Sequence, residues 1–432
     1  MAALCGLFYG SNKMATDVEV QFFSHLNGLT LGNNWGDLIR LLDKALVTGL
    51  DFTQITAASI DAQGDVHISL YAAHNAMLFQ VVELSGFTPT SLNQKYRIKG
   101  VPNATQLILK PAIDIAERSV TTIGAGKLAS LGYEIIFRDT DDVKRVYRAK
   151  NPLAKHPFIR VDESIASDTG NYNSTYSKYA MVGLLENMSH IDDFENPSVF
   201  QLPFDTSNVG KNWKITGSGN SCVRGWSRWY YATAYDIADF FQDMYVPTNG
   251  GRYFALTGDA DAFYFSVGST YEGRNVNLHG CGLYDSPAYS ITPNWFLMTH
   301  LTAHAISDTL SVASLEGSQA LRESDMASRF FVLKDGAITP ANTQKAKPIL
   351  PDLFSGYSNL YNGQTISALQ IPFSDLDSKL RGSLKHIHYA GQSKGAVQGM
   401  PLIAENSMYM YCNCVASSNT QCGFYYYLGE IE

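Results

Sequence analysis

The segment from Asn34 to Gly49 constrains the fold more than any other part of this chain. Its apolar residues recur at helical spacing and predict one short amphipathic helix, with a buried face of Leu38, Ile39, Leu41, Leu42, Ala45 and Leu46. Asn34 is the expected N-cap, Asp37 suits the positive first turn, and Gly49 can end the helix. Because strands and turns dominate the residues that follow, we expect this helix to dock against a sheet. The pattern argues against an α/β enzyme.

Alternation of apolar and polar residues, punctuated by turn signals, predicts strands along most of the chain. The clearest hairpin joins residues 252–257 to 262–267 across the turn Gly258-Asp259-Ala260-Asp261. A second hairpin joins residues 133–137 to 144–148. Further strands are predicted at residues 18–23, 66–70, 77–84, 96–98, 106–109, 158–161, 213–215, 330–333, 408–415 and 423–428. The predicted fold class is therefore mainly β, with antiparallel, sandwich-like domains and a few short helices.

Two later segments also have helical spacing. Lys178 to about His190 predicts a helix that buries Met181, Leu184, Leu185 and Met188, and residues 295–307 predict another. A chain of 432 residues is long enough for two or three domains. We expect an N-terminal arm (1–33), a helix plus first β domain (34–164), a second β domain (165–329) and a C-terminal β domain (330–432). Since no low-complexity linker separates them, we expect these units to pack closely.

Composition narrows the function classes. Charged residues make up 17% of the chain and aromatic residues 12%, including 25 Tyr, which favours sheet surfaces and protein–protein contacts. A net charge of −8 without a basic block argues against nucleic-acid binding. No apolar run approaches the roughly 20 residues that span a bilayer, and Met1–Met14 lacks the basic start of a signal peptide. We therefore expect assembly in a cytoplasm and no membrane partner.

Two motifs resemble metal sites but have simpler explanations. His300 and His304 have a zinc-like spacing on the predicted helix, with Asp308 as a third ligand, but Leu301 replaces the Glu that zinc proteases need. Surface or capped histidines are the favoured interpretation. Asp259 and Asp261 have the spacing by which some sugar-nucleotide enzymes hold a divalent ion, yet a hairpin turn explains both residues. No metal is predicted at either motif.

The six cysteines do not form a recognisable framework. Cys412, Cys414 and Cys422 lie near His386 and His388, but C-x-C with one further Cys is not the spacing of a structural zinc site. Reduced structural cysteines are the favoured interpretation, with a disulfide or a metal as the alternatives.

No catalytic motif is found, so we predict no catalytic or cofactor-binding residue and no cofactor. Residues 217–221 are rich in Gly and Ser but lack the Lys and the setting of a phosphate loop. The aromatic cluster with Trp226, Trp229 and Tyr231 has two interpretations. It forms an exposed interface that stacks on sugars or anchors a partner, or it packs in the core between two sheets, which is the favoured alternative.

The run Trp35-Gly36-x-Leu38-Ile39-x-Leu41-Leu42-Asp43-x-x-Leu46-Val47-x-Gly49 resembles the opening of a family of tailed-bacteriophage virion proteins. The order of later pieces is similar as well: the strand 158–164, a Met-containing helix at 181–188, the hairpin 254–265 and Leu-Arg-Gly-x-Leu at 380–384. Two departures are an insertion-like stretch from Ser266 to Asp325 and the lack of a Pro after Leu384. The resemblance implies a structural component of a virion, without fixing its place.

Two functions follow as hypotheses. The first is a structural protein of the tail, baseplate or neck, which binds other virion proteins and further copies of itself. The second is a glycan-directed module, either a receptor-binding protein or a polysaccharide-degrading enzyme. Low charge and the lack of a repeat of the kind that β-helical depolymerases show favour the first.

Overall fold

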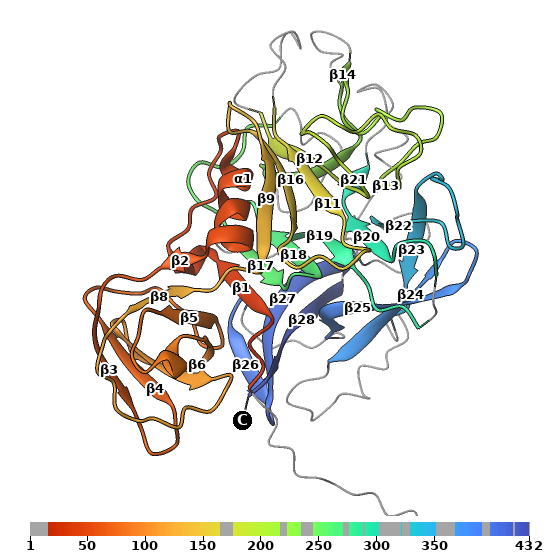
Figure 1. The fold of residues 1–432 in the computed structure, drawn as a ribbon. Coiled ribbons are helices and arrows are strands. Elements are labelled where there is room, and N and C mark those ends of the chain that lie inside the picture. Colours follow the sequence, from red (N-terminus) through yellow and green to blue (C-terminus); the bar gives the residue numbers. More distant parts are fainter. Residues whose placement is uncertain are drawn as a thin grey trace, which may run out of the picture.

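The computed structural model describes residues 16–164, 176–216, 223–234, 245–270, 276–287, 290–301, 321, 329–350, 368–390, 398–417 and 420–431. Their regular structure is almost entirely antiparallel β, in three large sheets and one two-stranded sheet (Figure 1). The predicted fold class is confirmed. The two-stranded sheet pairs β14 (Ile215–Thr216) with β15 (Val223–Arg224).

The first large sheet lies near the N-terminus of the described chain and has seven strands in the order β2-β8-β5-β6-β7-β4-β3. Alternation sets its inner face: in β4 (Val66–Leu70) the residues Val66, Ile68 and Leu70 are buried and the two between them are half-buried. The other strands are β2 (Leu50–Asp51), β3 (Ile55–Ile60), β5 (Val81–Ser85), β6 (Lys95–Asn103), β7 (Gln106–Pro111) and β8 (Ala125–Leu128). A 3-10 turn (Thr90–Leu92) precedes β6.

The second large sheet has the order β21-β16-β12-β11-β10-β9, with β13 paired to β12. Its strands are β9 (Tyr133–Arg138), β10 (Lys144–Ala149), β11 (Phe158–Asp162), β12 (Lys178–Leu185), β13 (Gln201–Leu202), β16 (Ser227–Ala232) and β21 (His300–Leu301). One face packs on the third sheet, as the rings of Trp229 and Phe265 show at 6.4 Å between centroids. This pair of sheets is the sandwich-like part of the molecule.

The third sheet has twelve strands in the order β1-β17-β18-β19-β20-β22-β23-β24-β25-β28-β27-β26. They are β1 (Gln21–Ser24), β17 (Phe254–Gly258), β18 (Ala262–Val267), β19 (Asn277–Leu283), β20 (Trp295–Met298), β22 (Phe330–Val332), β23 (Gln344–Pro348), β24 (Leu369–Asp375), β25 (Leu380–Tyr389), β26 (Pro401–Ala404), β27 (Ser407–Ser417) and β28 (Thr420–Glu430). The sheet curls back on itself. The rings of Tyr264 in β18 and Tyr426 in β28 show this, since their centroids are 6.1 Å apart. The curled sheet thus encloses a second core.

The predicted helix forms, but in two parts and with a different cap. An α-helix, α1 (Asp37–Leu42), continues into a π-helical turn (Asp43–Thr48), and the N–H of Gly49 closes it by donating to the Lys44 carbonyl at 2.8 Å. All six apolar residues of the predicted face are buried, and Figure 1 shows the helix beside β9. Asn34 is not the cap; the amides of Gly36 and Ile39 donate instead to the carboxylate of Glu163. No helix among the described residues is long and apolar enough to cross a membrane.

The predicted helix at Lys178–His190 is wrong. The segment begins with strand β12, whose eight residues are all buried. Ala180, Val182 and Leu184 face one core, whereas Met181 and Leu185 face another. A strand that is buried on both faces is apolar throughout, so its periodicity looks helical.

The predicted helix at residues 295–307 is also wrong where the structure describes it. Residues Trp295–Met298 and His300–Leu301 form β20 and β21, which belong to two different sheets. Thr299 between them is buried, and its hydroxyl donates to the Arg228 carbonyl at 3.2 Å. Residues 302–307 lie outside the described residues.

Strand pairing runs across each of the three expected domain boundaries. β1 of the expected arm pairs with β17, β11 pairs with β12, and β20 pairs with β22. Arg97 makes a further connection, because its buried guanidinium donates to the carbonyls of Asp17, Val20, Phe79 and Leu428 at 2.6–2.9 Å. The units therefore share sheets and packing, whatever division is drawn between them.

Candidate functional site

The aromatic residues that the sequence singles out are mostly interior. Trp229 is fully buried and stacks on Phe265 and His279, whereas Tyr231 is 1% exposed. Trp226 is partly exposed, with the Lys211 ammonium 4.1 Å from its ring centroid. Core packing, the favoured alternative, describes Trp229 and Tyr231. An interface through this cluster is therefore restricted to Trp226.

Tyr231 has a specific structural role at the start of α1. Its hydroxyl lies 2.6 Å from Glu163 Oε2 and 2.7 Å from the carbonyl oxygen of Asn34. Glu163 is buried and accepts hydrogen bonds from two helix amides at 2.7 Å, and no cation of the described residues pairs with it. Burial raises the pKa of Glu163 to about 7, against the opposing hydrogen bonds from Tyr231, Ile39 and Gly36.

His300 is not at the surface, so the expectation of a surface pair is wrong for this residue. Its ring packs edge-on against Tyr230 at 5.1 Å and lies 5.4 Å from the ring of His279. Burial, with Arg329 nearby, holds the pKa of His300 well below its usual value. His304 and Asp308 lie outside the described residues.

Asp259 and Asp261 form the predicted turn, and that prediction is confirmed. Asp259 Oδ1 accepts from the amides of Asp261 and Ala262 at 2.8 and 3.0 Å. The carboxylates also contact charged neighbours: Asp259 meets His386 at 2.9 Å, and Asp261 meets His156 at 2.7 Å and Lys385 at 2.5 Å. The His156 hydrogen bond and Lys385 outweigh burial and hold the pKa of Asp261 well below its usual range. Within the described ranges, no three His, Cys, Asp or Glu residues are grouped to hold a metal ion.

The described cysteine side chains are those of Cys281 and Cys412, which are buried thiols. Burial raises the pKa of the Cys281 thiol. This agrees with reduced structural cysteines at these two positions, and the side chains of the other four lie outside the described residues.

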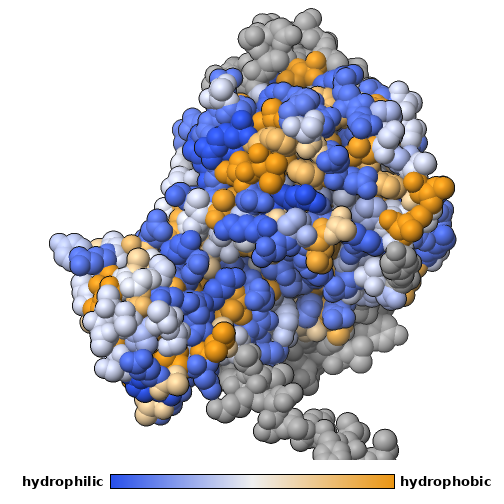
Figure 2. All heavy atoms as spheres, in the orientation of Figure 1, coloured by the Kyte–Doolittle hydropathy of each residue, from blue (hydrophilic) through white to orange (hydrophobic). Residues whose placement is uncertain are grey.

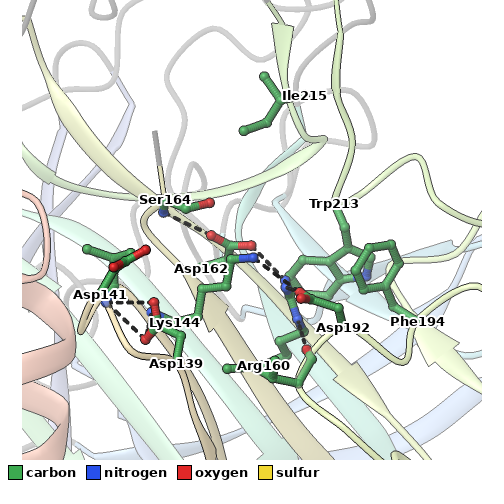
Figure 3. A pocket seen from close by; sticks show the side chains of 12 residues that line it. Asp139, Asp141, Lys144, Arg160, Asp162, Ser164, Asp192, Phe194, Trp213 and Ile215 are labelled. Carbon is green, nitrogen blue, oxygen red and sulfur yellow. Dashed lines mark hydrogen bonds and ion pairs between the residues drawn. The ribbon is translucent and has the colours of Figure 1, made fainter. Parts of the chain in front are cut away.

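A cavity of about 400 Å³ opens beside the second sheet (Figure 3). We call it the β10–β11 pocket. Its lining comes from the β9–β10 turn, the start of β10, the second half of β11 and the residues just after it, the loop after β12, and the start of β14 with the residues before it. The lining residues are Asp139, Asp141, Val143, Lys144, Arg160, Asp162, Ser164, Ile191, Asp192, Phe194, Trp213 and Ile215. Its size falls within the range of small-molecule sites, about 300–1,000 Å³.

Arg160 organises one side of the pocket. The carbon of its guanidinium lies 4.5 Å from the Trp213 ring centroid and 5.0 Å from that of Phe194. The group donates to the Ile191 carbonyl and to Asp192 Oδ1, both at 2.7 Å, and lies 2.9 Å from Asp162 Oδ2. This arrangement fixes the loop after β12 against β11.

The carboxylates of the pocket differ in how many hydrogen bonds and ion pairs they make. Asp139 accepts from the amides of Val143 and Lys144, and Asp192 accepts from Lys144 at 3.2 Å as well as from Arg160. Burial raises the pKa of Asp192, but the charges of Arg160 and Lys144 outweigh it and leave the pKa below its usual value. Asp141 is exposed and has no hydrogen bond or ion pair to the described residues. With respect to the described residues, Asp141 is therefore an open acceptor at the rim.

These pocket residues are not among the sites predicted from the sequence. Arg160 and Asp162 are two positions apart in an otherwise apolar strand, so they lie on one face of β11. Three aspartates also cluster in the preceding turn, at 139, 141 and 142. Charges on one face of a buried strand beside an acidic turn are a signal that sequence reasoning could have used.

Comparison with known proteins adds little. No protein-family model matches the chain, and no curated protein matches it. Among solved structures, a chain described as phage phi92 endosialidase is aligned with 10% sequence identity and a TM-score of 0.13. The alignment covers 89% of this chain and 51% of that one, so this chain spans about half of its length. A TM-score this low supports no argument about fold or function.

Proposed function

We propose that the chain is a structural component of a tailed-bacteriophage particle, in the tail, baseplate or neck, and that it acts by binding other virion proteins and copies of itself. The resemblance of residues 35–49 to such proteins supports the phage context. The observation that carries the assembly role is an exposed aliphatic patch at one end of the twelve-stranded sheet. Permanent protein–protein interfaces are large and comparatively apolar.

The aliphatic patch consists of Ile291, Ile338, Leu376 and Leu380, whose side chains are exposed by 57%, 76%, 55% and 61%. They lie on or beside three neighbouring loops, which connect β19 to β20, β22 to β23, and β24 to β25. The Thr292 hydroxyl donates to the Ala337 carbonyl at 2.8 Å, which joins the first two loops. Lys379 pairs with Asp335 at 3.5 Å, which joins the second to the third.

Figure 2 shows hydrophobic surface at the edge of the molecule over this region. Single exposed aliphatic residues are common on soluble proteins, but several on adjacent loops mark a contact surface. Burying them against a partner is favourable by about 25 cal/mol per Å² of apolar area. This contribution is not screened by salt as surface ion pairs are.

The test uses particles from the cells that produce this chain. We expect the chain to purify with them in fixed stoichiometry and to resist removal by moderate salt. The double variant Ile338→Asp with Leu380→Asp should fold but lose most of its incorporation, because the charges oppose burial at the interface. Ile113→Asp is the matched control, since Ile113 is 71% exposed on the first sheet, away from the patch. Equal incorporation of all three proteins, or a monomer found only outside particles, contradicts the proposal.

The second candidate function is a glycan-directed module, either for receptor binding or for polysaccharide degradation. The β10–β11 pocket is the observation that favours it, because an apolar wall faces several carboxylates there. No residue of the pocket is assigned a catalytic role.

A further inference from the structure

The β10–β11 pocket has an apolar wall and a polar rim. Val143, Ile191 and Ile215 join Phe194 and Trp213 on the wall. Trp213 is 6% exposed, with Arg160 over its ring and Gly183 so close that a Cβ there would lie 2.7 Å from the ring. The tryptophan is therefore almost wholly covered by protein groups. A ligand is left to contact the half-buried Phe194 and the aliphatic side chains.

The polar groups of the pocket are mainly acceptors. Four aspartates line it against one lysine and one arginine, which leaves a formal charge of −2 among the lining side chains. Both cations are already engaged, since Lys144 and Arg160 share Asp192 Oδ1. Asp141 and the Oδ2 atom of Asp192 accept no hydrogen bond from the described residues. A ligand that fits must therefore bring hydrogen-bond donors and must not bring negative charge.

Arg160 is held by protein groups and not by a ligand. It is 1% exposed, and its Nη1 atom pairs with Asp162 Oδ2 at 2.9 Å. The polar groups of the pocket that stay open to a ligand are therefore carboxylate oxygens, to which a ligand hydroxyl or ammonium donates.

From these observations we infer that the β10–β11 pocket binds a sugar unit that carries hydroxyls and a free amino group. The hydroxyls donate to the open carboxylate oxygens, and the ammonium matches the excess negative charge with Asp141 at the rim. The apolar face of the ring packs on Phe194 and Ile215. This inference rests on the second candidate function, glycan recognition, and does not depend on the role in assembly.

The test compares three sugars that share one ring. Glucosamine carries an ammonium, N-acetylglucosamine a neutral amide, and glucuronic acid a carboxylate. Binding to the purified full chain is measured by ligand-observed NMR and calorimetry at about pH 6, where the amine is protonated. We expect glucosamine to bind most tightly, N-acetylglucosamine less tightly, and glucuronic acid not at all. Added salt should weaken the binding of glucosamine more than that of N-acetylglucosamine.

Variants at Asp141 locate the binding. Asp141→Asn should weaken glucosamine about 2- to 5-fold, as an exposed ion pair allows, and leave N-acetylglucosamine within about twofold. Asp141→Lys should weaken glucosamine about tenfold or more, because attraction becomes repulsion. Asp114→Asn and Asp114→Lys are the matched controls, since Asp114 is exposed in the segment after β7, outside the pocket. The controls should leave the affinity for all three sugars unchanged.

Three results overturn the inference: none of the sugars binds, glucuronic acid binds as tightly as glucosamine, or the Asp141 variants behave like the Asp114 controls. Particle incorporation is measured on the same variants. If sugar binding fails while the chain still enters particles, the glycan inference is wrong and the assembly proposal stands. If incorporation fails while glucosamine binds at the pocket, the reverse holds.

Discussion

Two regions of this molecule bury charges in different ways. Where the first sheet and α1 meet the rest of the chain, Arg97 and Glu163 are held chiefly by neutral partners: four carbonyls for Arg97, and two amides with a tyrosine hydroxyl for Glu163. At the β10–β11 pocket and the β17–β18 turn, Asp192 and Asp261 meet cationic or histidine side chains.

The pKa shifts of the two groups of residues favour opposite ionisation states. Burial lowers the pKa of Arg97 to about 10 and raises that of Glu163 to about 7, so both groups move toward their neutral forms. The pKa values of Asp192 and Asp261 lie below their usual range, toward the charged form. Backbone dipoles replace lost hydration only in part, whereas an opposite charge more than offsets it. Charged groups that bind backbone atoms therefore connect distant segments of the chain. Charged groups that pair with other side chains lie closer to the surface, where a ligand can contact them.

Arg97→Met should have the largest effect. It leaves four buried carbonyls without their donor, and we expect a loss of about 4 kcal/mol or more in the free energy of unfolding. Urea denaturation measures it. Arg118→Met is the control, because Arg118 is exposed and donates to the Asp61 carbonyl at 3.2 Å. If both variants unfold at the same urea concentration as the parent, the guanidinium does not join the sheets as described.

Glu163→Gln should change the pH dependence of stability. The folded pKa of about 7 exceeds the unfolded value of 4.5, so the folded state binds the extra proton between these values. Stability from this group is therefore full below about pH 4.5 and falls as the pH rises to about 7, by on the order of 3 kcal/mol. The variant should lack this fall, whereas Glu117→Gln, at an exposed site, should keep it. Parallel stability curves for parent and Glu163→Gln contradict the raised pKa.

Arg160→Met should have a smaller effect than Arg97→Met, about 2 kcal/mol, because Asp192 is 48% exposed and can be solvated again. The pKa of Asp192 should rise toward its ordinary value, since Arg160 is the larger of the two charges that lower it. NMR titration of the side-chain carboxyl measures this shift. An unchanged titration in the variant would assign the lowered pKa to Lys144 alone.

Asp261→Asn should have the smallest effect, about 1 kcal/mol at neutral pH, since Asp261 is 28% exposed and solvent screens its ion pairs. Its pKa is depressed, so its contribution is present above the unfolded value of 3.8 and is lost as the pH falls below it. The variant and the parent should therefore converge in acid. Asp259→Asn, which keeps the turn geometry but removes the contact with His386, is the comparison. A difference between parent and Asp261→Asn that persists in strong acid would have another cause.

The sequence predicted local features well where one face of an element is exposed. The helix face at residues 38–46 and the hairpin at residues 252–267 are in place, because periodicity records which side meets the core. The prediction of secondary structure failed at β12 and β20. Both faces of these strands are buried, so their residues are apolar throughout and show no alternation. The pocket was also missed, since its residues come from four separate segments between Asp139 and Ile215.

By itself the sequence determined the mainly β fold class, the position of the one α-helix described, the acidic turn at 259–261 and the apolar faces of alternating strands. Only the tertiary structure decided that Glu163 caps α1 in place of Asn34, and that Arg97 binds carbonyls from segments as distant as Asp17 and Leu428. It also decided which strands share a sheet. Local pattern reports what each residue prefers to face, but the partner of a buried charge or strand edge is fixed only when distant segments exclude water from it together.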